Sequence, residues 1–122
     1  MTNPQKHDLE PNMRKQIGKI QAISFGMGGY QDAMIGISVT LGSNKDCWGV
    51  GDFKGSWGME RSEFAKWTEE DRIKQLGEMV MWAHKLMQQA NVENLNDLVD
   101  KPVEVIFEGM SLKSWRILTE VI

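Results

Sequence analysis

The chain has 122 residues, of which 41% are hydrophobic and 25% are charged, and its formal net charge is -3. This length and composition predict a single globular domain that can bury a core without metal ions or disulfides. Proteins that bind duplex DNA usually carry a strongly basic domain, so the acidic balance makes duplex DNA an unexpected partner.

The cysteine count and the N-terminal sequence bear on where the protein acts. Cys47 is the single cysteine, so the chain has no internal disulfide and no cysteine-rich zinc site, which fits a reducing cytoplasm. The N-terminus lacks the apolar core of a secretory signal, and no stretch approaches the roughly 18 apolar residues of a membrane span. Residues 1–14 hold two prolines and no periodicity, and we expect a flexible arm before a single domain at 15–122. We therefore expect a cytoplasmic protein without a membrane partner.

The first half of the domain predicts an antiparallel meander of three strands. Alternating apolar residues mark a strand at 15–25. A glycine-rich turn follows, and apolar and small residues then alternate in a second strand at 33–42. The loop at 42–46 leads into a third strand that begins at 47–50. Small residues on one parity of the second strand would let another group pack very close to the sheet; they are Gly36, Ser38 and Thr40.

One long helix is expected after the strands. Thr68 is its N-terminal cap, Glu69 and Glu70 occupy the first turn, and Asp71 completes an approximate capping box. Asn91 marks the end. Apolar residues recur at helical spacing along one face, which we expect to be buried: Ile73, Leu76, Val80, Ala83, Met87 and Ala90, widened by Met79, Trp82 and Leu86.

Two further alternating segments, at 103–108 and 115–122, finish the chain. The order βββ–α–ββ predicts an α+β fold with a single mostly antiparallel sheet and the helix packed on one face. One helix leaves the other sheet face without a cover, and the chain has nine methionines and five tryptophans. We therefore expect a homo-oligomer.

Few residues offer catalytic chemistry. The histidines are His7, in the expected arm, and His84, on the expected helix, and nothing in the spacing places either beside Cys47 as a nucleophilic pair would need. The carboxylates show none of the spacings of known metal sites. The glycine cluster at 26–29 precedes a strand rather than a helix, so it fits a turn better than a phosphate loop, although a backbone nest for an anion stays open. We expect no catalytic residues, metal or cofactor.

The segment 48–67 holds five of the ten aromatic residues and three basic ones, Lys54, Arg61 and Lys66. Two interpretations remain open. The segment either folds over the sheet and buries its own rings, as tryptophan usually is buried, or it lines a recognition surface on which a planar ligand stacks and cations hold phosphate. The candidate ligand-binding residues are Tyr30, Gln31, Asp32, Trp48, Asp52, Phe53, Trp57, Arg61 and Lys66.

Five phrases of the sequence resemble small accessory proteins encoded by tailed phages and prophages: GGYQDAM at 28–34, WGVGDF at 48–53, KWTEEDR at 66–72, KPVEVIFEG at 101–109 and SWRILTEV at 114–121. The resemblance covers roughly 15–122. It implies a phage accessory origin and action in the bacterial cytoplasm, and it carries over no catalytic residue.

Three hypotheses for function follow. The first is a non-enzymatic binding protein that antagonises a host defence system, by sequestering a nucleotide-like signal or by blocking a host protein. The second is a single-stranded nucleic-acid-binding protein of phage replication, which the acidic balance disfavours. The third is a small nucleotide-processing enzyme, which the lack of a plausible acid–base pair disfavours.

Overall fold

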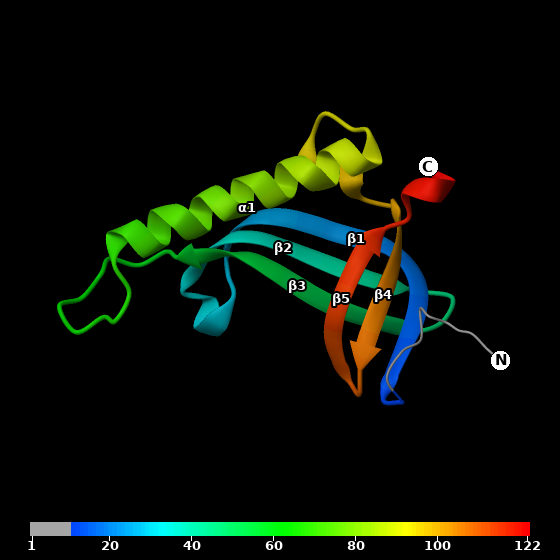
Figure 1. Cartoon of the computed structure of the whole chain (residues 1–122), viewed down its shortest axis with the longest axis horizontal. Helices are drawn as coiled ribbons and strands as arrows, with labels where there is room; N and C mark the ends of the chain where they lie inside the picture. The colour runs from blue at the N-terminus through cyan, green and yellow to red at the C-terminus, as the bar shows by residue number, and fades with distance from the viewer. Residues whose placement is uncertain (1–10) are drawn as a thin grey trace.

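The computed structural model describes residues 11–122, so the expectations for residues 1–10 and for His7 lie outside the described residues. The chain forms five strands and one long helix (Figure 1). The elements are β1 Met13–Gly28, η1 Tyr30–Asp32, β2 Met34–Ser43, β3 Trp48–Trp57, α1 Glu69–Ala90, η2 Leu95–Leu98, β4 Pro102–Glu108, β5 Ser111–Ile117 and η3 Thr119–Val121, where η marks a short 3-10 helix.

The strands form one antiparallel sheet in the order β3-β2-β1-β4-β5. The expected α+β fold, with its βββ–α–ββ order and one packed helix, is confirmed. Strand β1 is long enough to serve two partners, because its second half pairs with β2 and its first half with β4. A register shift between Ile20 and Ala22 separates the halves, and irregularities of this kind bend strands. Figure 1 shows β1 curving between the two parts of the sheet.

The bend closes the sheet on itself, so that side chains of the two halves meet. The Trp115 indole N–H, on β5, donates to Asp52 Oδ2 on β3 at 2.7 Å. The rings of Trp48 and Phe107 meet edge to face at 5.6 Å. The core therefore lies between the two halves of the sheet and beneath α1; its buried apolar residues are Ile20, Ile37, Val39, Leu41, Met79, Ala83, Leu86, Ala90, Leu98, Val103, Val105, Phe107 and Ile117.

The ends of α1 agree with the sequence prediction. Thr68 caps the helix, and both bonds of the capping box form: Asp71 N–H to Thr68 Oγ1 at 3.1 Å, and Thr68 N–H to Asp71 Oδ2 at 2.8 Å. Asn91 ends the helix in the left-handed region, with φ 57°. This conformation is common where helices stop.

The predicted buried face of α1 is partly wrong. Ile73 and Val80 are exposed, at 69% and 56% of their surface, whereas Met79 and Leu86 lie in the core. The apolar stripe is wider than the surface that one helix can bury. Trp82 packs edge to face on Trp115 at 6.2 Å. The side of α1 that bears Met79, Trp82 and Leu86 therefore faces the sheet, and the opposite side, with Ile73 and Val80, faces outward.

Three strand boundaries also differ from the prediction. β1 continues to Gly28, so the turn begins at Gly29, and β3 runs on to Trp57 through what was expected to be a long loop. The last strand was expected at 115–122, but β5 is Ser111–Ile117. It stops there because its partner β4 begins at Pro102, whose carbonyl accepts the Leu118 N–H at 2.9 Å. Residues after Leu118 therefore have no backbone groups of β4 opposite them with which to form hydrogen bonds.

Among residues 11–122, no helix combines the length and the apolar character needed to cross a membrane.

Replacing Leu86 with alanine should lower the free energy of unfolding by ~2–5 kcal/mol, because the change leaves a cavity in the core. Chemical denaturation measures this. Met110→Ala is the control, since Met110 lies exposed in the β4–β5 turn, and surface changes usually stay within ~0.5 kcal/mol. Equal effects of the two substitutions would show that Leu86 does not pack against the sheet.

The capping box should make stability depend on acid pH. The hydrogen bonds that Asp71 accepts from the backbone and the side chain of Thr68 hold its pKa below the ordinary value of 3.8. A carboxyl whose pKa is lower in the folded state contributes stability above its unfolded pKa and loses it as the pH falls through the folded pKa. The melting temperature of Asp71→Ala should therefore lie below that of the parent at pH 7, and the gap should narrow as the pH drops below about 3.8. A difference in melting temperature that stays constant with pH would show that Asp71 does not stabilise the helix through its ionised carboxylate.

Candidate functional site

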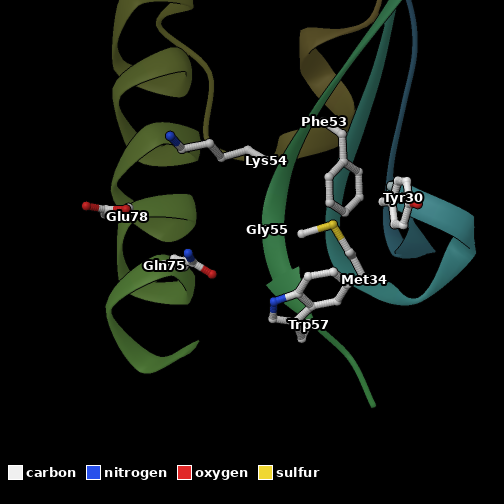
Figure 2. A pocket seen from close by; sticks show the side chains of 9 residues that line it. Tyr30, Met34, Phe53, Lys54, Gly55, Trp57, Gln75 and Glu78 are labelled. Atoms are coloured by element: carbon white, nitrogen blue, oxygen red, sulfur yellow. The ribbon is translucent and has the colours of Figure 1, made fainter. Parts of the chain in front are cut away.

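A cleft of about 530 Å³ lies where the start of α1 passes the end of β3, and we call it the aromatic cleft. Its lining residues are Gly29, Tyr30, Met34, Phe53, Lys54, Gly55, Trp57, Gln75 and Glu78. Figure 2 shows two sides. Tyr30, Met34, Phe53 and Trp57 form one wall, and α1 with Gln75 and Glu78 forms the other. The lining residues come from the turn around η1, from β2 and the edge strand β3, and from α1.

Glycines explain how Phe53 is seated in the aromatic wall. A Cβ at Gly36 would lie 2.8 Å from the Phe53 ring, at Gly29 3.0 Å, and at Gly28 3.3 Å. The ring therefore lies directly on backbone that has no side chains. Gly29 also has φ 66°, a region that glycine enters without strain. The prediction that the glycine cluster at 26–29 forms the turn is therefore only partly right, because Gly26 and Gly28 belong to β1 and Gly29 starts the turn. Gly28 and Gly29 also make room for Phe53.

The edge of β3 presents free backbone groups to the cleft. Strand β3 is at the edge of the sheet, and the Gly58 N–H donates to the Ala33 carbonyl at 2.9 Å. This bond marks which residues of β3 face β2, because hydrogen-bonded and outward-facing residues alternate along an antiparallel edge strand. The N–H and C=O groups that point away from β2 are those of Phe53, Gly55 and Trp57. The Phe53 N–H donates to its neighbour Asp52 at 2.9 Å. Gly55 thus offers an N–H and a C=O in the cleft, with no side chain in front of them.

The helical wall is tied to β3 by one buried polar contact. Ser56 is the buried polar residue of the described core, and its hydroxyl donates to Gln75 Oε1 at 2.5 Å. Because the Gln75 oxygen accepts this bond, its NH₂ group remains as a donor at the cleft. The contact fixes the distance between α1 and the strand.

Lys54 and Glu78 are the charged residues of the cleft. Neither forms an ion pair with another residue between positions 11 and 122. In Figure 2, Lys54 extends from β3 toward α1, and the Glu78 carboxylate points away from the aromatic wall. The ammonium group of Lys54 therefore lies on the α1 side of the cleft, without a carboxylate partner among the described residues.

The segment after β3 braces Trp57 from outside the cleft. The Trp57 and Trp67 rings stack with centroids 6.2 Å apart and planes 19° apart. Arg72 lies 4.5 Å above the Trp67 ring and donates to the Met59 carbonyl at 2.9 Å. The stack holds Trp57 in position for a ligand on its other side.

Three of the nine residues predicted from the sequence line the cleft: Tyr30, Phe53 and Trp57. Gln31 and Asp32 are exposed in η1, beside Tyr30 in the chain, with φ values of 54° and 55°. They hold the left-handed turn that projects Tyr30, and they do not line the cleft.

Trp48 and Asp52 face the interior of the curled sheet rather than the cleft. Asp52 accepts the Trp115 indole bond that joins the two halves of the sheet. Trp48 packs on Phe107, and its buried indole N–H has no hydrogen-bond partner among the described residues. Both interpretations of the segment 48–67 therefore hold in part, because some rings are packed inside and others line a cleft.

Arg61 and Lys66 lie on the segment between β3 and α1, outside the cleft lining. The Arg61 guanidinium donates to the backbone carbonyls of Trp67 and, at 3.1 Å, Ala65. It therefore shapes this segment. Lys66 is exposed.

The sequence analysis did not identify the other six lining residues, which are Gly29, Met34, Lys54, Gly55, Gln75 and Glu78. Lys54 was noted as a cation of the aromatic segment, and extending β3 to Trp57 would have placed it near the edge. Gln75 and Glu78 gave no signal, because both read as ordinary polar residues on the exposed side of the predicted helix.

No group of three or more histidine, cysteine, aspartate or glutamate side chains that could hold a metal ion occurs among residues 11–122. Comparison of the chain with protein-family models, with curated proteins and with solved structures found no match.

Replacing Gly36 with alanine should destabilise the fold and disturb the aromatic wall. The new Cβ would lie 2.3 Å from the Lys54 carbonyl oxygen and 2.7 Å from Gly55 Cα, so the two strands must move apart. We expect a loss of ~1–3 kcal/mol, as for other overpacked sites. Gly26→Ala is the matched control, because a Cβ there meets nothing within 4 Å. Denaturation curves of the two variants that coincide would refute the close contact.

Proposed function

We propose that the chain is a non-enzymatic binding protein and that the aromatic cleft holds a nucleotide-like small molecule. The observation that carries the proposal is one cleft of about 530 Å³ at an open strand edge, lined by three aromatic side chains on one side of β3 and, on the α1 side, by a lysine that has no ion pair within residues 11–122. Ligand clefts in proteins span ~300–1,000 Å³ and combine apolar walls with a few polar groups that set orientation.

The aromatic wall supports a planar ligand. Base–aromatic stacking contributes ~1–3 kcal/mol per base. Tyr30 is 67% exposed beside the wall, so its ring is free to stack. Trp57 and Phe53 are held by the Trp67 stack and by the glycines, so little side-chain freedom is lost on binding. The Gly55 backbone and the Gln75 amide supply hydrogen bonds for the edge of a base or for ribose hydroxyls.

The charges of the cleft favour a ligand with little phosphate charge. Lys54 is a cation that attracts phosphate, whereas Glu78 on the opposite wall repels it. With one cation and one carboxylate, the cleft should bind a ligand that carries one or two negative charges more readily than it binds a triphosphate. A cyclic nucleotide, or a nucleotide in which the phosphate is esterified twice, fits this balance.

The same lining supports binding without chemistry. It contains one carboxylate and one lysine, and it contains no serine, cysteine or histidine. A nucleophile with an adjacent base, or two carboxyls in different environments, would be needed for acid–base or covalent catalysis. We infer that the ligand is held and released unchanged.

The biological role rests on the resemblance to phage accessory proteins. A phage protein that holds a nucleotide-like signal removes it from the host receptor, which would blunt a nucleotide-signalled defence. Sequestration needs a cleft that binds tightly and does not turn over, and the aromatic cleft has those properties in this proposal.

Titration calorimetry and tryptophan fluorescence of the full chain test the proposal against AMP, cyclic mononucleotides, cyclic dinucleotides and ATP. We expect binding of a cyclic or singly charged nucleotide and weaker binding of ATP. Tyr30→Ala should raise the dissociation constant roughly 5- to 150-fold, which is ~1–3 kcal/mol of stacking. Lys54→Gln should raise it by roughly tenfold, the value of a charge-assisted contact.

Two matched controls separate the cleft from general surface effects. Phe64 is an exposed aromatic outside the cleft, and Lys45 is an exposed lysine in the β2–β3 loop. Phe64→Ala and Lys45→Gln should leave affinity unchanged. The absence of heat with every nucleotide would defeat the ligand proposal and leave the blocking of a host protein as the role to test by pulldown.

A further inference from the structure

Helix α1 carries an exposed apolar strip that the other elements between residues 11 and 122 leave uncovered. Ile73, Val80 and Met81 are 69%, 56% and 63% exposed. They lie at helical spacing around Gly77, where an added Cβ would meet nothing within 4 Å. We call Ile73, Gly77, Val80 and Met81 the α1 strip. Exposed contiguous apolar surface of this kind marks an interaction site.

The strip is nearly symmetric about Gly77. Ile73 lies four residues before Gly77 and Met81 four residues after it, with Val80 beside Met81. An antiparallel copy of the helix with its centre at Gly77 would therefore place Ile73 against Met81 and Val80 of the other copy. A two-fold interface requires this self-complementarity, because the same patch must serve both subunits.

The charged residues beside the strip are arranged so that residues before Gly77 are opposite in sign to residues at about the same distance after it. Lys74, Glu78 and Lys85 follow one flank of the strip, and Glu70 lies at its N-terminal end, nearly in line with Gly77. These four charges alternate in sign along the helix. None of the four forms an ion pair with any residue in 11–122.

Antiparallel pairing brings opposite charges together. Glu70 is seven residues before Gly77 and Lys85 eight after it, so each Glu70 meets the other copy's Lys85 within about one helical rise of 1.5 Å. Lys74 likewise falls within about two residues of Glu78 in the other copy, a gap that both long side chains can span. Parallel pairing would set like charges side by side, which is unfavourable.

We propose that α1 is the interface of a homodimer in which two copies pair antiparallel, with the two-fold axis at Gly77. The occupant of the strip is a second copy of this chain. Gly77 lets the two backbones approach closely, and the apolar side chains pack on either side of the crossing. On the sheet face that α1 covers, Phe25 and Met27 are also exposed and would extend the apolar contact beyond the helices. This proposal does not depend on a ligand in the aromatic cleft.

Sedimentation equilibrium of the full chain, at micromolar concentration and low salt, tests the proposal. The parent protein should be a dimer. Gly77→Arg should give a monomer, because its side chain fills the crossing point, while circular dichroism shows an intact helix, since arginine favours helix more than glycine does. Met110→Arg is the control, because Met110 is exposed in the β4–β5 turn away from α1, and it should remain dimeric. A monomeric parent, or a Gly77→Arg variant that still dimerises, would overturn the proposal.

Charge exchange tests the antiparallel register, even if Gly77→Arg fails to fold. Glu70→Lys and Lys85→Glu should each weaken the dimer by roughly 5- to 30-fold, because each change creates two like-charge contacts per dimer. The double variant restores opposite charges and should return the dissociation constant to within about threefold of the parent. Glu93→Lys, an exposed charge beyond α1, should change nothing. A double variant weaker than both single variants would exclude the register.

Discussion

A five-stranded sheet with one covering helix must bury most of its apolar surface against itself, and the remaining features of the molecule follow from that constraint. The register shift at Ile20–Ala22 divides β1 between two partners and lets the sheet curl. The curl brings Trp115 to Asp52 and Trp48 to Phe107. Each contact joins a residue of one half to a residue of the other, so the sheet supplies the cover that a second helix layer supplies in other folds.

The curl of the sheet also gives the two ends of β3 different surroundings. One end of this strand is inside the closed part of the sheet, where Trp48 and Asp52 are used for packing. The other end leaves the closed part and passes under α1, where Phe53 and Trp57 reach the surface and Gly55 keeps its backbone groups free. A single strand thus has a structural half and a half that is open to a ligand. The division falls near Asp52, whose carboxylate accepts both the Trp115 indole N–H and the Phe53 backbone N–H.

Features set by local chemistry could be predicted from the sequence, and features set by long-range geometry could not. The capping box at Thr68 and the stop at Asn91 depend on residues within one turn of each other, and both were predicted. The alternation at 33–42 likewise gave a strand within one residue at each end. The buried side of α1 depends on Trp82 meeting Trp115, a contact across 33 residues of sequence. The periodicity does not report such a contact, so it could not show which side of the wide apolar stripe is buried and that Ile73 and Val80 are exposed.

The same distinction between local chemistry and long-range geometry applies to the residues of the candidate site. The aromatic residues Tyr30, Phe53 and Trp57 were identifiable because aromatic residues beside glycines are a local pattern, although their places in η1 and on β3 were not predicted. Gln75 and Glu78 enter the cleft only because Ser56 is buried and bonds to Gln75. Arg61 was chosen for its charge, but its donors are occupied by backbone carbonyls of its own segment.

Glu78 connects the two proposals physically. It lines the aromatic cleft, its carboxylate is turned away from the aromatic wall, and it lies on the flank of the α1 strip. In an antiparallel dimer, Lys74 of the second copy would lie near this carboxylate and offset its repulsion of an anion in the cleft. A nucleotide should then bind more tightly to the dimer than to the monomer. By linkage, the nucleotide must strengthen the dimer by the same factor. A Lys74→Gln substitution would remove this coupling at its source, because dimerisation would then bring no added positive charge to the cleft, so affinity and dimerisation would become independent of each other.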